Sequence, residues 1–389
     1  MITSDGLMSK DKLRVGFILH LTADWLGGVN YYRNLLNLIY DNPDMNIEPV
    51  VFYTTKMDGS LLNGFPPVEY VKLNGWDRFC SKRLREIFHK EKYWELLAKK
   101  YRIDIFSHSA VLVDTIKVIS WLPDFQHKYL SELFDARELA SREEYFNRLA
   151  KNADGVILSS NDAKKDFERF YPDFASKAAV YQFFVPIEKF EYNVQDLRNR
   201  YNVPQKFFFI PNQFWKHKNH RIVLEALKIL SDKGNKDIKV YCSGNTRDIR
   251  NVNYFRDLMQ YCDDNGLDNR FFVLGSIPYR DVQALQRECH ALINPSLFEG
   301  WSTMVEEAKS LGKLIILSDI AVHKEQNPAG GIFFEHMSAQ DLASKMELVW
   351  KLDNKIKQDL QENAGLELKK REREAIITYR RILDDTLAR

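Results

Sequence analysis

Two glutamates eight residues apart are the strongest candidates for chemistry in this chain. Glu299 and Glu307 lie within the stretch PSLFEGWSTMVEEA, which follows a short apolar run over residues 290–294. The apolar run predicts a buried strand, and the glycine after Glu299 predicts a turn. Because a carboxylate repels a phosphate, both glutamates make chemical sense as acceptors of hydrogen bonds from neutral hydroxyls. Sugar and ribose diols supply such hydroxyls, so the pattern predicts a nucleotide-sugar site.

The elements around the two glutamates are predicted from capping and periodicity. Thr303 with Glu306 reads as a capping box, so we expect a helix from Met304 to near Gly312. The next apolar run, residues 313–319, predicts a second buried strand. The loop then lies at the carboxyl end of a parallel sheet, where ligands bind.

The start of this helix is a predicted phosphate site, because unpaired amides and the helix dipole favour an anion there. The amides concerned belong to Gly300, Trp301, Ser302 and Thr303.

The stretch resembles the E-x7-E motif of the retaining glycosyltransferases of family 4, which have the GT-B fold. The family's usual form is PS-aromatic-EG before a helix with a second Glu, and Trp301-Ser302 stands here where Phe-Gly is more common. The resemblance implies that Glu299 contacts the donor sugar, that Glu307 contacts the donor ribose, and that the amides after Gly300 contact the sugar or diphosphate. The simpler alternative is a solvated loop glutamate followed by ordinary charges at a helix start.

The expected phosphate cations depart from the family pattern. The segment NQFWKHKNH places Lys218 at the family's lysine, but Gln213 stands where the family has an arginine. One cation is therefore missing or is supplied by Lys216. Lysines bind anions as point charges and lack the bidentate fork of arginine. His217 and His220, three residues apart, are not interpreted as a metal pair.

Glycines and small residues mark the rest of the predicted donor site. Gly27 and Gly28 precede a predicted amphipathic helix, as in the family's first loop, which approaches the donor diphosphate. Gly244 ends one predicted strand, and Ser276 and Ile277 follow another. We expect these segments to cradle the base and the diphosphate.

The acceptor side has competing candidates for a polar group that faces the reacting sugar. The family's usual histidine aligns with Pro123, which leaves Asp124 and His127 as candidates, with His108 as a weaker one. The near-neutral pKa of a histidine suits proton handling, although a histidine in an aromatic segment is often a packing residue.

Length and composition set the broad class. At 389 residues two domains are expected, and 45% hydrophobic with 28% charged residues is typical of a globular protein. Because the amino-terminal sequence is polar and charged, we expect no signal peptide. No apolar run suggests a membrane span. The four separated cysteines fit a reducing cytoplasm. A net charge of +2 does not indicate nucleic-acid binding.

The expected fold is α/β, with two Rossmann-like domains facing a cleft and a C-terminal helix that crosses back to the first domain. The predicted acceptor domain covers residues 1–187, with 372–389 packing back on it, and the predicted donor domain covers 188–371. Within the last helix the expected buried stripe is Ile376, Ile377, Tyr379, Ile382 and Leu383.

The basic segment 82–102 reads as an amphipathic helix or helix pair. It is suited to contact with anionic lipid, although a surface helix packed on the core is the favoured interpretation.

The predicted activity is transfer of a sugar from a nucleotide-diphosphate sugar to a hydroxyl of a carbohydrate or lipid-linked glycan, with retention, in polysaccharide or glycoconjugate synthesis. No cofactor or metal is expected, because the aspartate pairs 263–264 and 384–385 are not Asp-x-Asp motifs. Two alternatives stay open, a nucleotide-sugar epimerase of the same fold and a non-catalytic sugar-nucleotide-binding subunit. The base, the sugar and the acceptor are not encoded in the motif.

Overall fold

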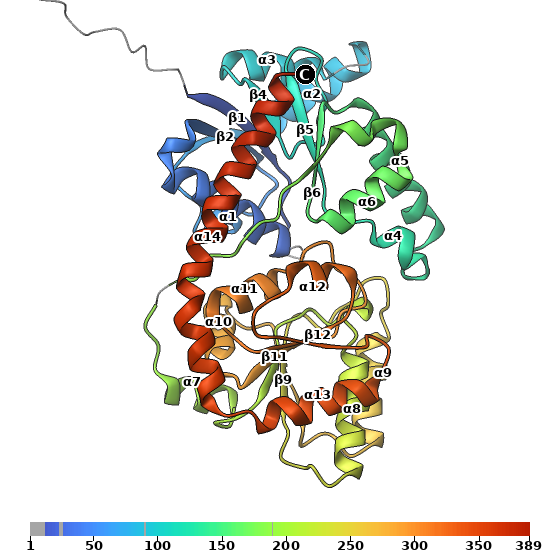
Figure 1. Cartoon of the computed structure of the whole chain (residues 1–389). Coiled ribbons are helices and arrows are strands. Elements are labelled where there is room, and N and C mark those ends of the chain that lie inside the picture. The colour runs from blue at the N-terminus through green and yellow to red at the C-terminus, as the bar shows by residue number, and fades with distance from the viewer. Residues whose placement is uncertain (1–11, 23–25, 89–90, 189) are drawn as a thin grey trace, which may run out of the picture.

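The computed structural model describes residues 12–22, 26–88, 91–188 and 190–389. It consists of two lobes, each built on one parallel sheet, joined along one side by a long C-terminal helix (Figure 1). No helix in these described ranges is long and apolar enough to cross a membrane.

The first lobe contains a seven-stranded sheet of order β3-β2-β1-β4-β5-β6-β7. Its strands are β1 (Leu13–Leu19), β2 (Ile47–Thr54), β3 (Glu69–Leu73), β4 (Ile105–Ser107), β5 (Lys117–Leu122), β6 (Gly155–Leu158) and β7 (Ala178–Val180). Its helices are α1 (Leu26–Asp41), α2 (Gly75–Phe88), α3 (Lys92–Lys100), α4 (Gln126–Tyr129), α5 (Ala136–Asn152) and α6 (Asn161–Phe170).

The second lobe contains a six-stranded sheet of order β10-β9-β8-β11-β12-β13. Its strands are β8 (Phe208–Ile210), β9 (Val240–Ser243), β10 (Phe271–Gly275), β11 (Ala291–Asn294), β12 (Ile315–Ser318) and β13 (Gly331–Phe334). Its helices are α7 (Val194–Tyr201), α8 (His220–Asp232), α9 (Tyr254–Asp264), α10 (Tyr279–Glu288), α11 (Thr303–Leu311), α12 (Ala321–Gln326) and α13 (Ala339–Lys351).

Both sheets are buried on both faces, so their strands are nearly continuous apolar runs. In the second lobe Phe208 and Ile210 point into one core cluster, and Phe207 and Phe209 point into the other, as the two-residue period of a strand requires. In each sheet the strand order reverses beside the first strand, between β1 and β4 and between β8 and β11. Loops at the carboxyl ends of these strands form the usual ligand-binding position.

The last helix, α14 (Asn354–Leu387), runs from the second lobe onto the first (Figure 1). Tyr379, Ile382 and Leu383 are buried in the core of the first lobe, and the hydroxyl of Tyr379 donates to Oγ of Ser107 at 2.9 Å. The crossing helix is therefore confirmed, but one residue of its expected stripe is wrong. Ile377 is 56% exposed, because it lies on the opposite side of the helix.

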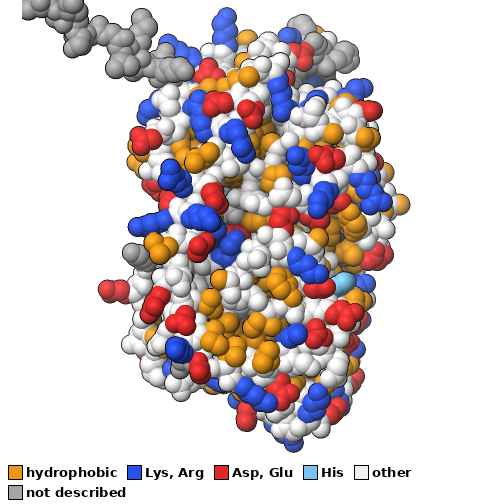
Figure 2. Space-filling view, in the orientation of Figure 1, with side chains coloured by type: hydrophobic (Ala, Val, Ile, Leu, Met, Phe, Trp, Pro, Cys, Tyr) orange, Lys and Arg blue, Asp and Glu red, His pale blue; other side chains and the backbone are white. Residues whose placement is uncertain are grey.

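Segment 82–102 is a helix pair, and its first member begins earlier than expected, at Gly75. Helix α3 packs on the core through Trp94 and Leu97, as the favoured interpretation predicts. Helix α2 behaves differently, because it leaves large apolar side chains exposed. Over the face shown in Figure 2, basic and acidic side chains are interspersed, in keeping with the small net charge.

Two helix starts differ from the expectation. Helix α1 begins at Leu26, so Gly27 and Gly28 belong to its first turn rather than to a loop before it. Helix α6 is capped by Ser160, whose Oγ accepts from the amide of Ala163 at 3.0 Å. The next two residues, Asn161 and Asp162, donate from their backbone amides to Glu325 of the other lobe.

The second difference is at the central motif. Helix α11 begins at Thr303 with Ser302 as its N-cap, and no side chain caps it. The predicted capping box is wrong because Glu306 is held elsewhere: it accepts from Gln326 at 3.0 Å and from Arg371 of α14 at 2.6 Å.

Candidate active site

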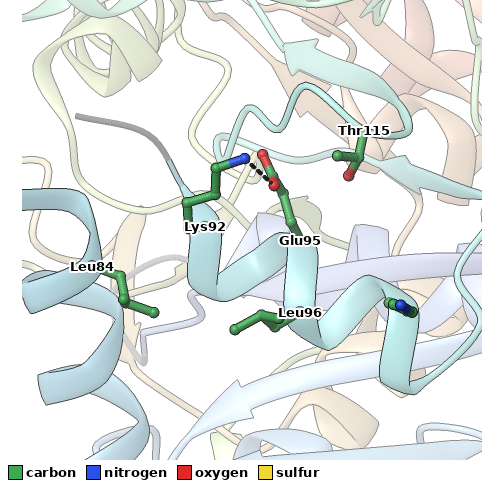
Figure 3. A pocket seen from close by; sticks show the side chains of 6 residues that line it. Leu84, Lys92, Glu95, Leu96 and Thr115 are labelled. Atoms are coloured by element: carbon green, nitrogen blue, oxygen red, sulfur yellow. Dashed lines mark hydrogen bonds and ion pairs between the residues drawn. The ribbon is translucent and has the colours of Figure 1, made fainter. Parts of the chain in front are cut away.

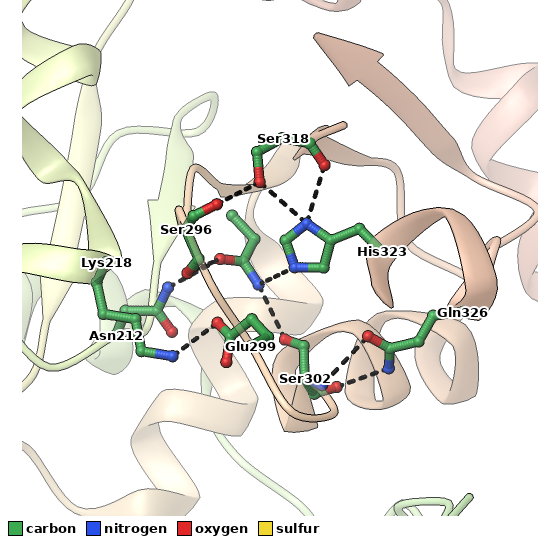
Figure 4. Close-up of polar contacts among 9 residues, drawn as sticks. Asn212, Lys218, Ser296, Glu299, Ser302, Ser318, His323 and Gln326 are labelled. Atoms are coloured by element: carbon green, nitrogen blue, oxygen red, sulfur yellow. Dashed lines mark hydrogen bonds and ion pairs between the residues drawn. The ribbon is translucent and has the colours of Figure 1, made fainter. Parts of the chain in front are cut away.

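Glu299 and Lys218 form a largely buried ion pair at the point where the second sheet reverses its strand order. Lys218 ends the short 3-10 helix Lys216–Lys218 after β8, and Glu299 lies in the loop after β11. Since β8 and β11 are hydrogen-bonded neighbours, their following loops meet. The Lys218 Nζ to Glu299 Oε1 distance is 2.6 Å, and the side chains are 14% and 10% exposed (Figure 4).

The electrostatics favour a charged Glu299. Burial alone would raise the pKa of this carboxyl, but the charge and the hydrogen bond of Lys218 outweigh burial and lower the pKa. The pair therefore presents a carboxylate and an ammonium side by side.

Glu307 is held by two donors from another helix. The hydroxyl of Tyr279 donates to its Oε1 and the amide of Gln286 donates to its Oε2, each at 2.6 Å. Tyr279 and Gln286 are seven residues apart on α10 and so share one face of that helix. Burial raises the pKa of Glu307, although these two hydrogen bonds oppose the shift. Each carboxylate oxygen keeps a lone pair for a further donor.

A buried polar network lies beneath the Glu299 loop (Figure 4). The Nδ2 of Asn294 donates to Oγ of Ser302 at 2.9 Å and lies 3.3 Å from Nε2 of His323. The Nδ1 of His323 contacts the backbone oxygen of Ser318 at 3.0 Å, so this nitrogen carries the proton and the ring is neutral. Burial lowers the pKa of His323 to about 4, consistent with that state. The network fixes both ends of the loop that carries Glu299.

The amides at the start of α11 are not all open to a ligand as expected. The amide of Ser302 donates to Oε1 of Gln326 at 3.2 Å, and Nε2 of Gln326 donates back to the Ser302 carbonyl. The indole of Trp301 donates to the carbonyl of Phe183 in the first lobe at 2.9 Å. Trp301 thus joins the two lobes.

Gly300 touches the first lobe directly. A Cβ at this position would lie 2.2 Å from the carbonyl oxygen of Pro123 and 2.9 Å from Cβ of Asp124. Only glycine allows this approach. The structure therefore brings Asp124 to the Glu299 loop, with its Oδ1 accepting from the amide of Gln126 at 2.9 Å.

His127 points elsewhere. It is 3% exposed and packs edge-to-face on Phe146 of α5, with ring centroids 4.8 Å apart. Burial and the nearby Arg142 and Lys128 lower its pKa. His108 is also buried in the first lobe, where Tyr31 and Ser107 contact its two ring nitrogens.

The loops expected to cradle the donor lie together. The amide of Gly244 donates to the carbonyl of Gly275 at 2.9 Å, one residue before Ser276 and Ile277. Gly244 has φ of +146° and a Cβ there would lie 2.4 Å from the carbonyl oxygen of Asn212, so glycine is required.

Three residues were expected to meet phosphate. Lys218 is paired with Glu299, Lys216 is exposed to solvent, and Gln213 has a structural role. The Oε1 of Gln213 accepts from the amide of Asn245 at 2.7 Å and so anchors the loop after β9.

Sequence reasoning missed Tyr279, Gln286 and His323. Tyr279 and Gln286 are seven residues apart on one amphipathic helix, and this spacing is a signal in the sequence by which they could have been identified. Across the described ranges, no three His, Cys, Asp or Glu side chains are grouped so as to hold a metal ion.

Solved structures share this architecture. HepE of Anabaena, in complex with UDP and glucose, has a TM-score of 0.68 with 16% identity, covering 97% of this chain and 99% of that one. The lipopolysaccharide outer core galactosyltransferase WaaB has a TM-score of 0.60 with 18% identity, covering 94% and 99%. Two Rossmann-like sheets facing each other, with a C-terminal helix that crosses back, define the GT-B fold.

Residues 194–366 match the family described as glycosyl transferases group 1. The matched region is less than half of the chain. It contains the E-x7-E stretch and is similar to the family that this motif predicts. The N,N'-diacetylbacillosaminyl-diphospho-undecaprenol α-1,3-N-acetylgalactosaminyltransferase of Campylobacter jejuni is 27% identical over 168 residues, which are 39% of this chain and 42% of that protein. The O-antigen chain mannosyltransferase of Salmonella typhimurium is 25% identical over 129 residues, 33% and 34% of the two chains. The match thus spans less than half the length of these curated relatives.

Proposed function

We propose that this protein transfers a sugar, with retention, from a nucleotide-diphosphate sugar to a hydroxyl acceptor. The observation that carries the proposal is the buried Glu299–Lys218 pair at the β8/β11 reversal, with the doubly anchored Glu307 on the following helix. A carboxylate for neutral hydroxyls beside a cation for phosphate suits a nucleotide sugar, which carries both groups.

Each charged group has a distinct proposed role. Glu299 accepts hydrogen bonds from hydroxyls of the donor sugar, and Glu307 accepts from the ribose. Lys218 neutralises charge on the leaving diphosphate, with Lys216 as an exposed second cation. Gly244, Ser276 and Ile277 contact the base and diphosphate through their backbone, and Gly27 and Gly28 approach the diphosphate from α1.

In the proposed reaction the acceptor oxygen forms a bond to the anomeric carbon on the face from which the diphosphate leaves. The bond from that carbon to the diphosphate oxygen breaks, and the acceptor's proton passes to the diphosphate. The chain supplies position and charge stabilisation rather than a nucleophile.

Asp124 is the better supported group on the acceptor side. It lies against Gly300, one residue from Glu299, whereas His127 packs against Phe146. We assign Asp124 to orient the sugar or the acceptor hydroxyl and leave His127 with a packing role. The proposed acceptor domain is residues 1–187 with 372–389, and the proposed donor domain is 188–371.

The relatives narrow the substrate classes that we propose. HepE is in complex with UDP and glucose, and the Campylobacter jejuni relative acts on a diphospho-undecaprenol. A uridine nucleotide sugar and a lipid-linked acceptor are the first choices for this chain, in glycoconjugate synthesis.

A lipid-linked acceptor requires a contact with a membrane surface, for which helices α2 and α3 are the proposed site. Trp76, Phe79 and Ile87 are exposed on α2 among arginines and lysines. A cavity of about 350 Å³ lies between the two helices (Figure 3), lined by Leu84, Lys92, Glu95, Leu96, Lys99 and Thr115.

A thermal-shift panel tests the proposal. The panel tests wild type and Glu307→Ala against UDP, GDP, ADP, CMP and their sugars. Each measurement is made once with EDTA and once with Mg²⁺. One nucleotide class should raise the melting temperature of wild type but not that of the variant. At a hundred times its Kd, the nucleotide should stabilise the wild-type fold by ~2.7 kcal/mol. Release of nucleoside diphosphate only when an acceptor is present would then distinguish transfer from epimerisation. No shift with any nucleotide would refute the proposal.

A further inference from the structure

Arg33 of the first lobe lies over the ring of Tyr279 in the second lobe, the residue that holds the glutamate that we assign to ribose. Its Cζ lies 5.6 Å from the centroid of the Tyr279 ring, and the hydroxyl of Tyr279 donates to Glu307. The charge of Arg33 acts on Glu307, whose pKa is raised chiefly by burial and lowered in part by this guanidinium. A cation of α1 therefore stands beside the donor site, although no family motif points to it.

The guanidinium is largely uncommitted within the described part of the chain. Of its five N–H donors, one has a hydrogen-bond partner among the described residues: Nη2 donates to Oδ1 of Asn30 at 2.8 Å. Among the described residues, no carboxylate oxygen lies within 4.0 Å of it. A half-buried guanidinium beside an aromatic ring and without an anion is suited to bind one.

The direction of the side chain supports a diphosphate ligand. Asn30 lies one turn nearer the start of α1, so its bond to Nη2 turns the guanidinium toward that end. Gly28 precedes Arg33 by roughly 7.5 Å of helix, a distance that an arginine side chain spans. The amino-terminal end of α1 also carries the positive end of the helix dipole.

The charge balance of the site requires a further cation. Lys218 is paired with Glu299, and Gln213, at the position of the family's arginine, is engaged by the backbone of Asn245. A nucleoside diphosphate brings more than one negative charge, so one shared lysine and the exposed Lys216 leave it under-neutralised.

We propose that Arg33 binds the diphosphate of the nucleotide donor and supplies, from the opposite lobe, the cation that Gln213 does not. The proposal rests on the proposed function and adds a donor-binding residue to it. Because Arg33 belongs to the first lobe, it also couples donor binding to the contact between the lobes.

The test compares nucleoside diphosphates with nucleosides. Binding of UDP, ADP and GDP is measured by calorimetry, and binding of uridine, adenosine and guanosine by ligand-observed NMR at millimolar concentration. The proteins are wild type, Arg33→Met, Arg33→Gln, which keeps a donor for Asn30, and Arg33→Lys. The control is Arg148→Ala, which removes another arginine–tyrosine contact of the first lobe, on α5, where the guanidinium carbon lies 5.5 Å from the Tyr145 centroid.

We expect Arg33→Met and Arg33→Gln to bind the preferred diphosphate about 10- to 100-fold more weakly, the range for loss of a charged hydrogen bond. The matching nucleoside should change less than threefold, and Arg33→Lys should recover part of the loss. Equal weakening of diphosphate and nucleoside, or no weakening in either neutral variant, overturns the role of Arg33 and leaves the proposed function standing. If wild type binds none of the three diphosphates, both proposals fall.

Discussion

The ion pair between Glu299 and Lys218 stabilises the site in the absence of a ligand, because each charge is paired when the donor is absent. Both side chains are removed from most of their water, so neither tolerates the loss of its partner. When the donor binds, its hydroxyls therefore meet a Glu299 carboxylate that is already held in place, and binding does not have to order this side chain. The same reasoning applies to Glu307, which Tyr279 and Gln286 orient before any ribose arrives.

Removing the cation should cost more stability than removing both partners. We expect Lys218→Met to lower the free energy of unfolding by about 2–4 kcal/mol, because Glu299 is left buried and unpaired. The double variant Lys218→Met/Glu299→Gln should recover about half of that loss. Urea unfolding at pH 7.5 measures both, and a double variant no more stable than Lys218→Met would contradict the prediction.

The pH dependence of this pair has a defined sign. Because the folded-state pKa of Glu299 is lowered, its contribution is present above the pKa of an unfolded glutamate and is lost as the pH falls through the folded value. The difference between wild type and Lys218→Met should therefore shrink in acid.

Loss of either donor to Glu307 should weaken nucleotide binding without unfolding the chain. Tyr279→Phe removes one hydroxyl and leaves the ring beside Arg33, so we expect affinity to fall about five- to tenfold, as for one hydrogen bond. Calorimetric titration with the nucleotide found in the thermal-shift panel measures it. Gln286→Leu should act similarly, and unchanged affinity in both would show that Glu307 needs no anchoring.

At the scale of elements, the parts readable from sequence were those encoded locally. Glu299, Glu307 and the strand–loop–helix unit around them lie within one short stretch. The crossing of α14 was implied by the resemblance to the GT-B family, and its periodicity predicted which side chains are buried. The capping of α11 was misjudged because Glu306 is taken by Arg371, a residue 65 positions away in the chain. Arg33 and Tyr279 likewise meet only through the fold, so no local pattern brings them together.

Gly300→Ala should separate the lobes, because its Cβ would meet the carbonyl of Pro123 at 2.2 Å. The backbone at this residue has no positive φ, so the effect reports the contact between lobes rather than backbone strain. We expect a lower melting temperature and at least tenfold lower turnover. The matched control is Gly365→Ala within α14, where a Cβ meets nothing within 4 Å and helix propensity should add about 1 kcal/mol. Equal behaviour of the two variants would contradict the prediction.

At the scale of the molecule, the two lobes are held together by polar contacts between their rims as well as by α14. Glu325 accepts from the amides that begin α6, and Arg250 binds Glu138 of α5 at 3.0 Å. Contacts of this kind are partly exposed and individually weak, so the lobes are joined by a surface that can separate.

Acid should destabilise the donor lobe more steeply than the acceptor lobe, in which burial lowers the pKa of His108 to about 3 and also lowers the pKa of His20 and of His127. Burial lowers the pKa of His217 and of His220 to about 3, and that of His290 and of His323 to about 4, all in the second lobe. Unfolded histidine titrates near 6.5, so each one takes up a proton on unfolding at pH 5. Stability should then fall by ~1.4 kcal/mol per histidine for each pH unit below about 6.

His220→Phe tests this mechanism within the lobe. Both ring nitrogens of His220 are buried, with no hydrogen-bond partner in the part of the chain that the structure describes. The ring stacks on Phe214 with centroids 4.3 Å apart. Phenylalanine keeps the stacking and takes up no proton. The variant should therefore be at least as stable as wild type at pH 7.5. Between pH 6 and 5 its free energy of unfolding should fall by ~1.4 kcal/mol less than that of wild type. Urea melts at both pH values measure the slope, and hydrogen exchange corrected for its intrinsic rate shows which lobe opens. An unchanged slope, or earlier opening of the first lobe, would mean that the buried histidines do not set the acid limit of the fold.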